Sequence, residues 1–251
     1  MDWKELYQMI PLQVRTFGET VTGDTSPITQ QNLSEADIDR LQDVIAASRS
    51  YKQGLLDQFY GQDNPDMDNY AYNQYKKAFP NEEAVQYFQS GGGNVSYDDY
   101  YNARQGGRGD LDISPSASIM NTLGQFSYST ADNPEKTLNI TDSYDFYNDY
   151  NAQVMPKEVA NTARYEGLDN LDKLKLLAKE TWQMPGRQAD MKTGIQSLPS
   201  RLGNAFVGKD NARPVNIQFT PNRDLNPSEM QRNAIKEVIL QQILGNYWWL
   251  N

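Results

Sequence analysis

Residues 123–146, "LGQFSYSTADNPEKTLNITDSYDF", decide the fold that we expect for this chain of 251 residues. Two runs with large side chains at every second position flank the polar segment "ADNPEK". A period of two is typical of a strand with one buried face, and Asp, Asn and Pro favour a turn. The sequence therefore predicts a β-hairpin at about residues 124–145. Its alternating positions are Phe126 and Tyr128, then Leu138, Ile140, Asp142 and Tyr144.

A third strand is expected at residues 214–220, where Val215, Ile217 and Phe219 alternate between two prolines. Proline cannot donate a hydrogen bond to a sheet ladder, so strands that contain it are typically found at sheet edges. We therefore expect an edge strand that extends the hairpin into a small antiparallel sheet.

Most of the remaining chain has the spacing of helices. The clearest begins after Ser34, which has Asp37 three residues later as in a capping box and is followed by apolar residues at helical spacing. Further helices are expected in "YNQYKKAF", "NEEAVQYFQ" and "LDNLDKLKLLAKETWQ", and after Asn226 near the end of the chain. The glycine-rich stretch at residues 90–110 predicts a flexible loop.

The expected fold class is therefore α+β, mostly helical with a small antiparallel sheet. Two regions are expected. Residues 1–110 form a helical region with long polar loops, and residues 111–251 form an α+β region with the hairpin and a C-terminal helix.

Composition limits the classes of function. A formal charge of -10 and a pI near 4.6 oppose binding to nucleic acid, because phosphate contacts need clustered Lys and Arg. The absence of cysteine and histidine excludes thiolate zinc sites and Ser-His or Cys-His nucleophiles. No stretch approaches the roughly 20 apolar residues of a transmembrane helix, and the N-terminus is not typical of a signal peptide.

The two strands of the hairpin, "LGQFSY" and "LNITDSYDF", resemble a module of bacteriophage virion proteins and the active-site hairpin of colicin M-type bacteriocins. In the colicin M family the second strand ends in Asp-any-Tyr-Asp, and here Asp142, Tyr144 and Asp145 stand at those positions. This resemblance implies a magnesium-dependent phosphodiesterase that splits lipid II. The family's activity also requires a His-Arg pair soon after the motif, where this chain has Asn151 and Ala152.

The motif has two physical interpretations. In a strand, Asp142 and Tyr144 project from one face and Asp145 from the other. Asp142 and Asp145 could hold Mg²⁺ together with waters, and a carboxylate can act as a base toward a metal-bound water. Alternatively, Asp142 accepts backbone N–H groups where the strand ends, and the aromatic rings pack on neighbouring helices.

The chain ends in "NYWWLN", in which Tyr247, Trp248, Trp249 and Leu250 are aromatic or apolar. These side chains either anchor a partner or fold onto the chain's own core. Together with the resemblance, they lead us to expect a bacteriophage virion component, structural or concerned with delivery through the host envelope. It would act in an oligomeric assembly with other virion chains and without a cofactor. The alternative is a colicin M-like enzyme that uses Mg²⁺.

Overall fold

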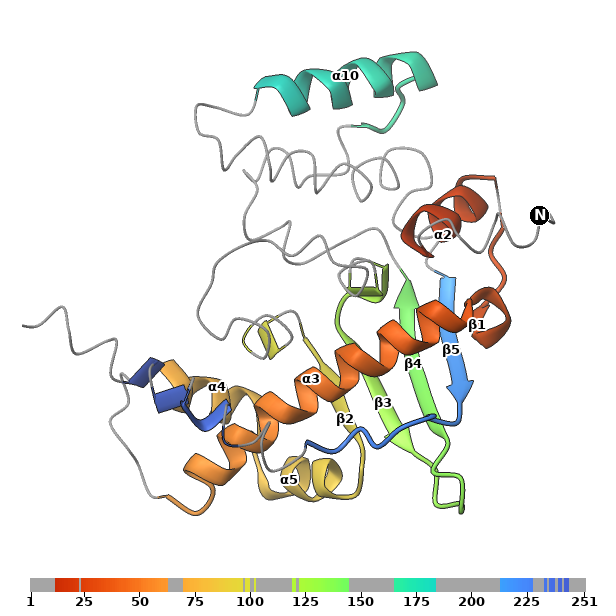
Figure 1. The fold of residues 1–251 in the computed structure, drawn as a ribbon. Helices are drawn as coiled ribbons and strands as arrows, with labels where there is room; N and C mark the ends of the chain where they lie inside the picture. Colours follow the sequence, from red (N-terminus) through yellow and green to blue (C-terminus); the bar gives the residue numbers. More distant parts are fainter. Residues whose placement is uncertain are drawn as a thin grey trace, which may run out of the picture. The chain divides into compact units, whose positions relative to one another are not determined.

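The fold is seen in a computed structural model (Figure 1). The described residues are 12–22, 24–62, 70–96, 98–99, 102, 119–120, 122–144, 165–183, 213–227, 233, 235–237, 239–240 and 242–243. In chain order the elements are α2 (Leu12–Val21), β1 (Ile28–Thr29), the 3-10 helix η1 (Gln30–Asn32), α3 (Glu35–Phe59), α4 (Tyr70–Ala78), α5 (Glu82–Gln89), β2 (Gly93–Val95), β3 (Phe126–Thr130), β4 (Leu138–Tyr144), α10 (Asn170–Gln183) and β5 (Arg213–Phe219).

The chain divides into two compact units. The first comprises Met1–Ile28 and Ser143–Val215, and the second comprises Thr29–Asp142 and Asn216–Asn251. The predicted boundary near residue 110 lies outside the described residues, so that division stays a prediction. In the described part of the chain, no helix combines the length and the apolar character needed to cross a bilayer.

The fold class is α+β, as predicted, and its strands form one sheet in the order β1-β5-β4-β3-β2. The predicted hairpin is confirmed, because β3 and β4 pair antiparallel with Tyr128 opposite Ile140. On its other side β3 pairs antiparallel with β2, where Val95 lies opposite Phe126. Figure 1 shows β2, β3, β4 and β5 side by side.

The third strand is confirmed as β5, but its predicted place at the edge of the sheet is wrong. Its side chains alternate between buried and exposed positions, with Val215, Ile217 and Phe219 buried. The strand lies between β4 and β1, so β1 forms the edge instead. The two residues of β1 are too few to show a period of two, and the sequence therefore gives no sign of this strand.

The glycine-rich stretch also differs from the prediction, because part of it is strand β2. A Cβ atom on Gly93 would lie 2.7 Å from the Tyr128 hydroxyl oxygen, closer than carbon and oxygen can approach. Glycine therefore allows the aromatic side chain of β3 to lie directly over β2. Gly93 therefore permits close contact between neighbouring strands, whereas the prediction assigned the stretch to a flexible loop.

Helix α3 begins as the sequence predicts. The Asp37 backbone N–H donates to the Ser34 hydroxyl oxygen at 3.2 Å, and the Ser34 backbone N–H donates to the Asp37 carboxylate at 3.0 Å. This reciprocal pair satisfies two backbone donors that a helix start otherwise leaves without partners. The cap fixes where α3 begins, and therefore which side chains of its 25 residues face the core.

The core of the second unit packs around the second half of α3. Edge-on and tilted ring contacts connect Phe59 with Tyr72 and Tyr75 of α4, and Phe79 with Phe88 of α5. Ring pairs of this kind add to the stability gained from burial alone. The cluster comprises Tyr51, Leu55, Leu56, Phe59, Ala71, Tyr72, Tyr75, Phe79, Val85, Phe88, Ile235 and Ile239.

The first unit contains a completely buried arginine at the start of β5. The Arg213 guanidinium donates to the Ser26 carbonyl oxygen and to the Glu19 carboxylate, both at 2.9 Å, and lies 3.5 Å from an Asp24 carboxylate oxygen. A buried charge is costly unless it is paired and hydrogen-bonded, and these contacts provide both. Arg213 therefore ties β5 to the end of α2 and the segment that follows it.

Candidate functional site

The structure describes the side chain of only one residue of the Asp-any-Tyr-Asp motif. Asp142 lies on β4 and is half-buried, on the same side of the strand as the buried Leu138 and Ile140. Tyr144 ends β4, but its side chain is not described, and Asp145 lies outside the described residues. The predicted anchor residues 247–250 also lie outside them.

A magnesium site cannot be assembled from the residues described. Within the described ranges, no three acidic, histidine or cysteine side chains gather closely enough to hold a metal ion. Of the two predicted ligands, only Asp142 is described, and it does not line the cavity found at the other end of the hairpin. Because Asp145 lies outside the described residues, the metal centre that the colicin M resemblance implies stays a prediction.

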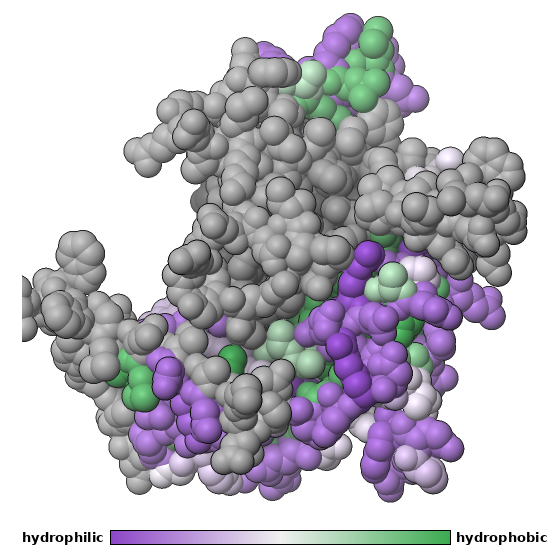
Figure 2. All heavy atoms as spheres, in the orientation of Figure 1, coloured by the Kyte–Doolittle hydropathy of each residue, from purple (hydrophilic) through white to green (hydrophobic). Residues whose placement is uncertain are grey.

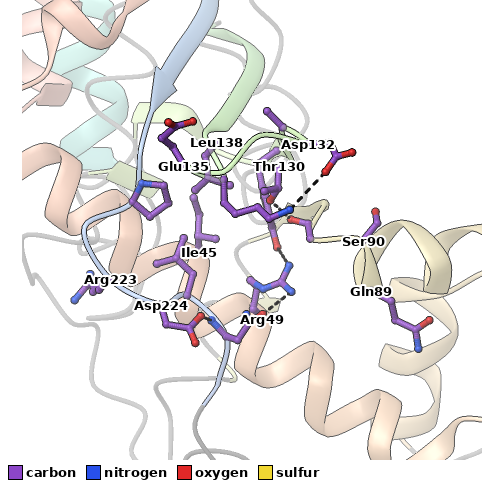
Figure 3. Close-up of a pocket in the computed structure, with 17 residues that line it drawn as sticks. Ile45, Arg49, Gln89, Ser90, Thr130, Asp132, Glu135, Leu138, Arg223 and Asp224 are labelled. Atoms are coloured by element: carbon purple, nitrogen blue, oxygen red, sulfur yellow. Dashed lines mark hydrogen bonds and ion pairs between the residues drawn. The ribbon is translucent and has the colours of Figure 1, made fainter.

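A cavity of about 650 Å³ lies in the second unit, where the hairpin turns (Figure 3). Its volume falls within the range of small-molecule sites, roughly 300–1,000 Å³. Side chains of α3, the end of α5, the hairpin and the segment after β5 surround it. The lining residues are Ile45, Arg49, Gln89, Ser90, Gly91, Tyr128, Thr130, Ala131, Asp132, Glu135, Lys136, Leu138, Pro221, Arg223, Asp224, Leu225 and Asn226.

Arg49 is the most buried charged side chain of this cavity, with 8% of its surface exposed. Its Nη1 donates to the Gly92 carbonyl oxygen at 3.4 Å and to the Tyr128 hydroxyl oxygen at 3.2 Å. Its Nη2 donates to the Asn226 side-chain oxygen at 3.0 Å. The guanidinium carbon lies 4.8 Å from the centre of the Phe88 ring, which stabilises the cation further.

All the partners of Arg49 are electrically neutral. Its contacts include no carboxylate among the described residues, although a buried guanidinium normally pairs with one. The other two cations of the cavity are paired: Lys136 lies 3.6 Å from Asp132, and Arg223 lies 2.6 Å from Asp43. Arg49 is thus the one cation of the described lining without a carboxylate partner.

Tyr128 stays protonated beside this arginine. Burial raises the pKa of its phenol, and the nearby Arg49 cation only partly opposes that shift. The neutral hydroxyl can accept from Arg49 but cannot neutralise its charge. Another phenol, that of Tyr87, donates to the Tyr128 carbonyl oxygen at 2.8 Å and ties α5 to β3 beside the cavity.

The segment after β5 is held against α3 by polar contacts. The Asn222 backbone N–H donates to the Gln42 side-chain oxygen at 3.1 Å. Arg223 donates to the Asp39 carbonyl oxygen at 2.9 Å as well as to Asp43. Together with the Arg49–Asn226 contact, these bonds span several turns of α3 and hold this wall of the cavity in place.

The hairpin side of the cavity is equally ordered. The Thr130 hydroxyl donates to the Gly91 carbonyl oxygen at 2.8 Å, which joins the end of β3 to the loop before β2. In the turn, the Thr137 backbone N–H donates to the Asn133 side-chain oxygen at 3.0 Å. The predicted polar turn therefore forms, and it positions the cavity's charged rim as well as reversing the chain.

Sequence reasoning missed Arg49, although a signal was present. Arg49 follows Leu41 and Ile45 at intervals of four residues, so it lies on the apolar face of the predicted helix. Lys52 lies on nearly the same face and is also buried, paired with Asp99 at 3.2 Å. Basic residues at core positions of a helix indicate buried polar contacts, and this pattern could have drawn attention to both.

A second feature is the apolar face of α10 in the first unit. Leu177 of this helix packs with Tyr165 in a small buried cluster. One and two turns earlier, Leu174 and Leu171 have 49% and 60% of their surfaces exposed. Figure 2 shows apolar side chains of α10, in green, at the surface. The predicted helix is thus confirmed, and Leu171 and Leu174 on its apolar face are exposed.

Comparisons of the chain with known protein families, with curated proteins and with solved structures found no match.

Proposed function

We propose that the protein is a bacteriophage virion component that acts through contacts with other chains, one of which is made by helix α10. The observation that carries the proposal is the exposure of Leu171 and Leu174, one turn apart on the same helix. Burying them against a neighbouring chain would remove apolar surface from water, at roughly 25 cal/mol per Å². The hairpin's resemblance to a module of bacteriophage virion proteins supports a virion as the assembly in which this contact is made.

Composition supports the same proposal. Only 38% of the residues are hydrophobic, and the mean hydropathy is -0.77. A chain with so few apolar residues gains stability when its exposed apolar side chains are buried against another chain. Subunits of an assembly stabilise one another through such contacts. The predicted anchor at residues 247–250 would add a second contact of the same kind.

The test replaces both leucines, as Leu171→Glu with Leu174→Glu, in the full-length chain. Glutamate is a good helix former, and acidic side chains near a helix N-terminus interact favourably with the helix dipole. The substitutions should therefore preserve α10 while preventing apolar burial. In sedimentation velocity, the unaltered chain should form concentration-dependent oligomers, and the variant should remain a monomer with the same melting temperature.

Leu240→Glu is the matched control, because Leu240 is also exposed, with 43% of its surface accessible, but lies in the second unit. This variant should associate as the unaltered chain does. If the unaltered chain is a monomer at all concentrations and particles purified from the host lack the protein, the proposal fails.

A further inference from the structure

The cavity around Arg49 has the composition of a ligand site and belongs to the second unit, whereas α10 belongs to the first. A guanidinium carries five N–H donors, and three contacts to neutral acceptors occupy three of them. One donor on Nε and one on Nη2 have no acceptor among the described residues. These two nitrogens share one edge of the guanidinium, the edge from which arginine donates to both oxygens of a carboxylate.

The surroundings of Arg49 set the chemistry of what would bind. Ile45, Leu138 and Leu225 supply apolar lining, and Gln89, Ser90 and Thr130 supply hydrogen-bonding groups (Figure 3). The acidic lining residues Asp132, Glu135 and Asp224 disfavour ligands with several negative charges. A single carboxylate attached to a short apolar chain matches both the cation without a carboxylate partner and the apolar wall.

We propose that this cavity binds a monocarboxylate carried on an apolar chain, with the carboxylate on the free edge of the Arg49 guanidinium. Binding would give the buried cation a direct carboxylate partner, which it lacks among the described residues. The proposal does not depend on the function proposed above. The bound carboxylate could belong to a small organic acid, or to a glutamate side chain between apolar residues of another protein.

The test uses hexanoate as the small acid and the blocked peptide acetyl-Leu-Glu-Leu-amide as the protein-like source. Each is titrated into the full-length chain by calorimetry, and the Arg49 Nε–H resonance is followed by ¹H–¹⁵N NMR. Hexanoate or the peptide should bind saturably and shift that resonance. Hexanol, which has the same length without the charge, should bind at least about tenfold more weakly, because it cannot form charge-assisted hydrogen bonds.

Arg49→Met should weaken binding by at least about tenfold, since methionine keeps apolar bulk and removes the charge. Arg223→Met is the matched control, because Arg223 lines the same cavity but is already paired with Asp43. This variant should bind the same probe with a Kd within about twofold of that of the unaltered chain. If Arg49→Met fails to fold, Arg49→Lys replaces it in the test. This variant keeps the charge but loses the two-donor edge, so it should also bind the probes more weakly than the unaltered chain.

The tighter of the two probes identifies the source of the carboxylate. The proposal is overturned if neither probe binds. It is also overturned if hexanol binds the unaltered protein as tightly as hexanoate does. The same holds if Arg49→Met binds the probes as tightly as the unaltered chain.

Discussion

The Arg49 guanidinium of α3 lies 3.2 Å from the Tyr128 hydroxyl of β3 and joins this 25-residue helix to the hairpin. Tyr128→Phe would remove the acceptor and leave one more donor of a buried cation without a partner. We expect a loss of about 1.5–3 kcal/mol in the free energy of unfolding, measured by urea titration.

Tyr87→Phe is the control for that substitution. The Tyr87 hydroxyl donates to a neutral carbonyl, and the side chain is 46% exposed, so water can replace the lost bond. The expected loss is below about 1 kcal/mol. Equal losses in the two variants would show that the charge of Arg49 contributes nothing to the bond.

Gly93→Ala tests why a glycine-rich stretch forms strand β2. The added Cβ would lie 2.7 Å from the Tyr128 hydroxyl oxygen, so either the ring or the strand must move. We expect a destabilisation of about 1–3 kcal/mol, as for other overpacked sites. Gly18→Ala, in open space on α2, should instead stabilise the protein by up to about 1 kcal/mol. Destabilisation by Gly18→Ala alone would contradict this account.

Tyr51→Phe should stabilise the protein, because the Tyr51 hydroxyl is buried and has no hydrogen-bond partner among the described residues. Removing it should raise the free energy of unfolding at neutral pH by about 1 kcal/mol. A loss of stability in urea titration would show that the hydroxyl has a favourable contact.

The same variant should unfold less readily in alkali. Burial, reinforced by Tyr70, Asp99 and Asp98, raises the pKa of Tyr51 above its ordinary value of 10.0. The unfolded chain therefore loses this proton first, and stability falls as the pH rises through 10. Between roughly pH 9 and 11, Tyr51→Phe should show a shallower fall than the unaltered chain. In this variant stability still falls somewhat with pH, because burial also raises the pKa of Tyr128.

The parts of the fold that were predictable have local causes. The cap of Ser34 and Asp37 and the alternation in β3, β4 and β5 follow from nearest neighbours in the sequence, and all are present. Strands β1 and β2 were missed because two or three residues carry no period and glycine signals a loop. The pairing of β2 depends on a ring that lies 35 residues further along the chain.

The candidate site was less predictable because it is made by distant segments. Arg49 meets Tyr128 and Asn226 only after the chain has folded, across separations of 79 and 177 residues. Sequence spacing could place Arg49 on a buried face, but it could not show that every partner there is neutral. The Asp-any-Tyr-Asp motif was visible in the sequence, and its catalytic role stays a prediction.

If the protein is a virion component, it should not split lipid II. Asn151 stands where the colicin M family has its histidine, and the chain has no histidine anywhere that could move a proton. Purified protein with magnesium should therefore release no pyrophosphate-linked product. Turnover that is lost in Asp145→Ala, with an unchanged melting temperature, would instead establish the enzyme, and Glu135→Ala at the hairpin turn serves as the control carboxylate.

The central claim, that α10 contacts another chain, is tested most directly by a photo-cross-linker placed at Leu174 in assembled particles. Irradiation should link α10 to a peptide of a neighbouring chain, identified by mass spectrometry. The same group at Asp172, about 160° away around the helix, should give far less product. No link to a neighbouring chain from position 174, or equal yields from both positions, would contradict the account.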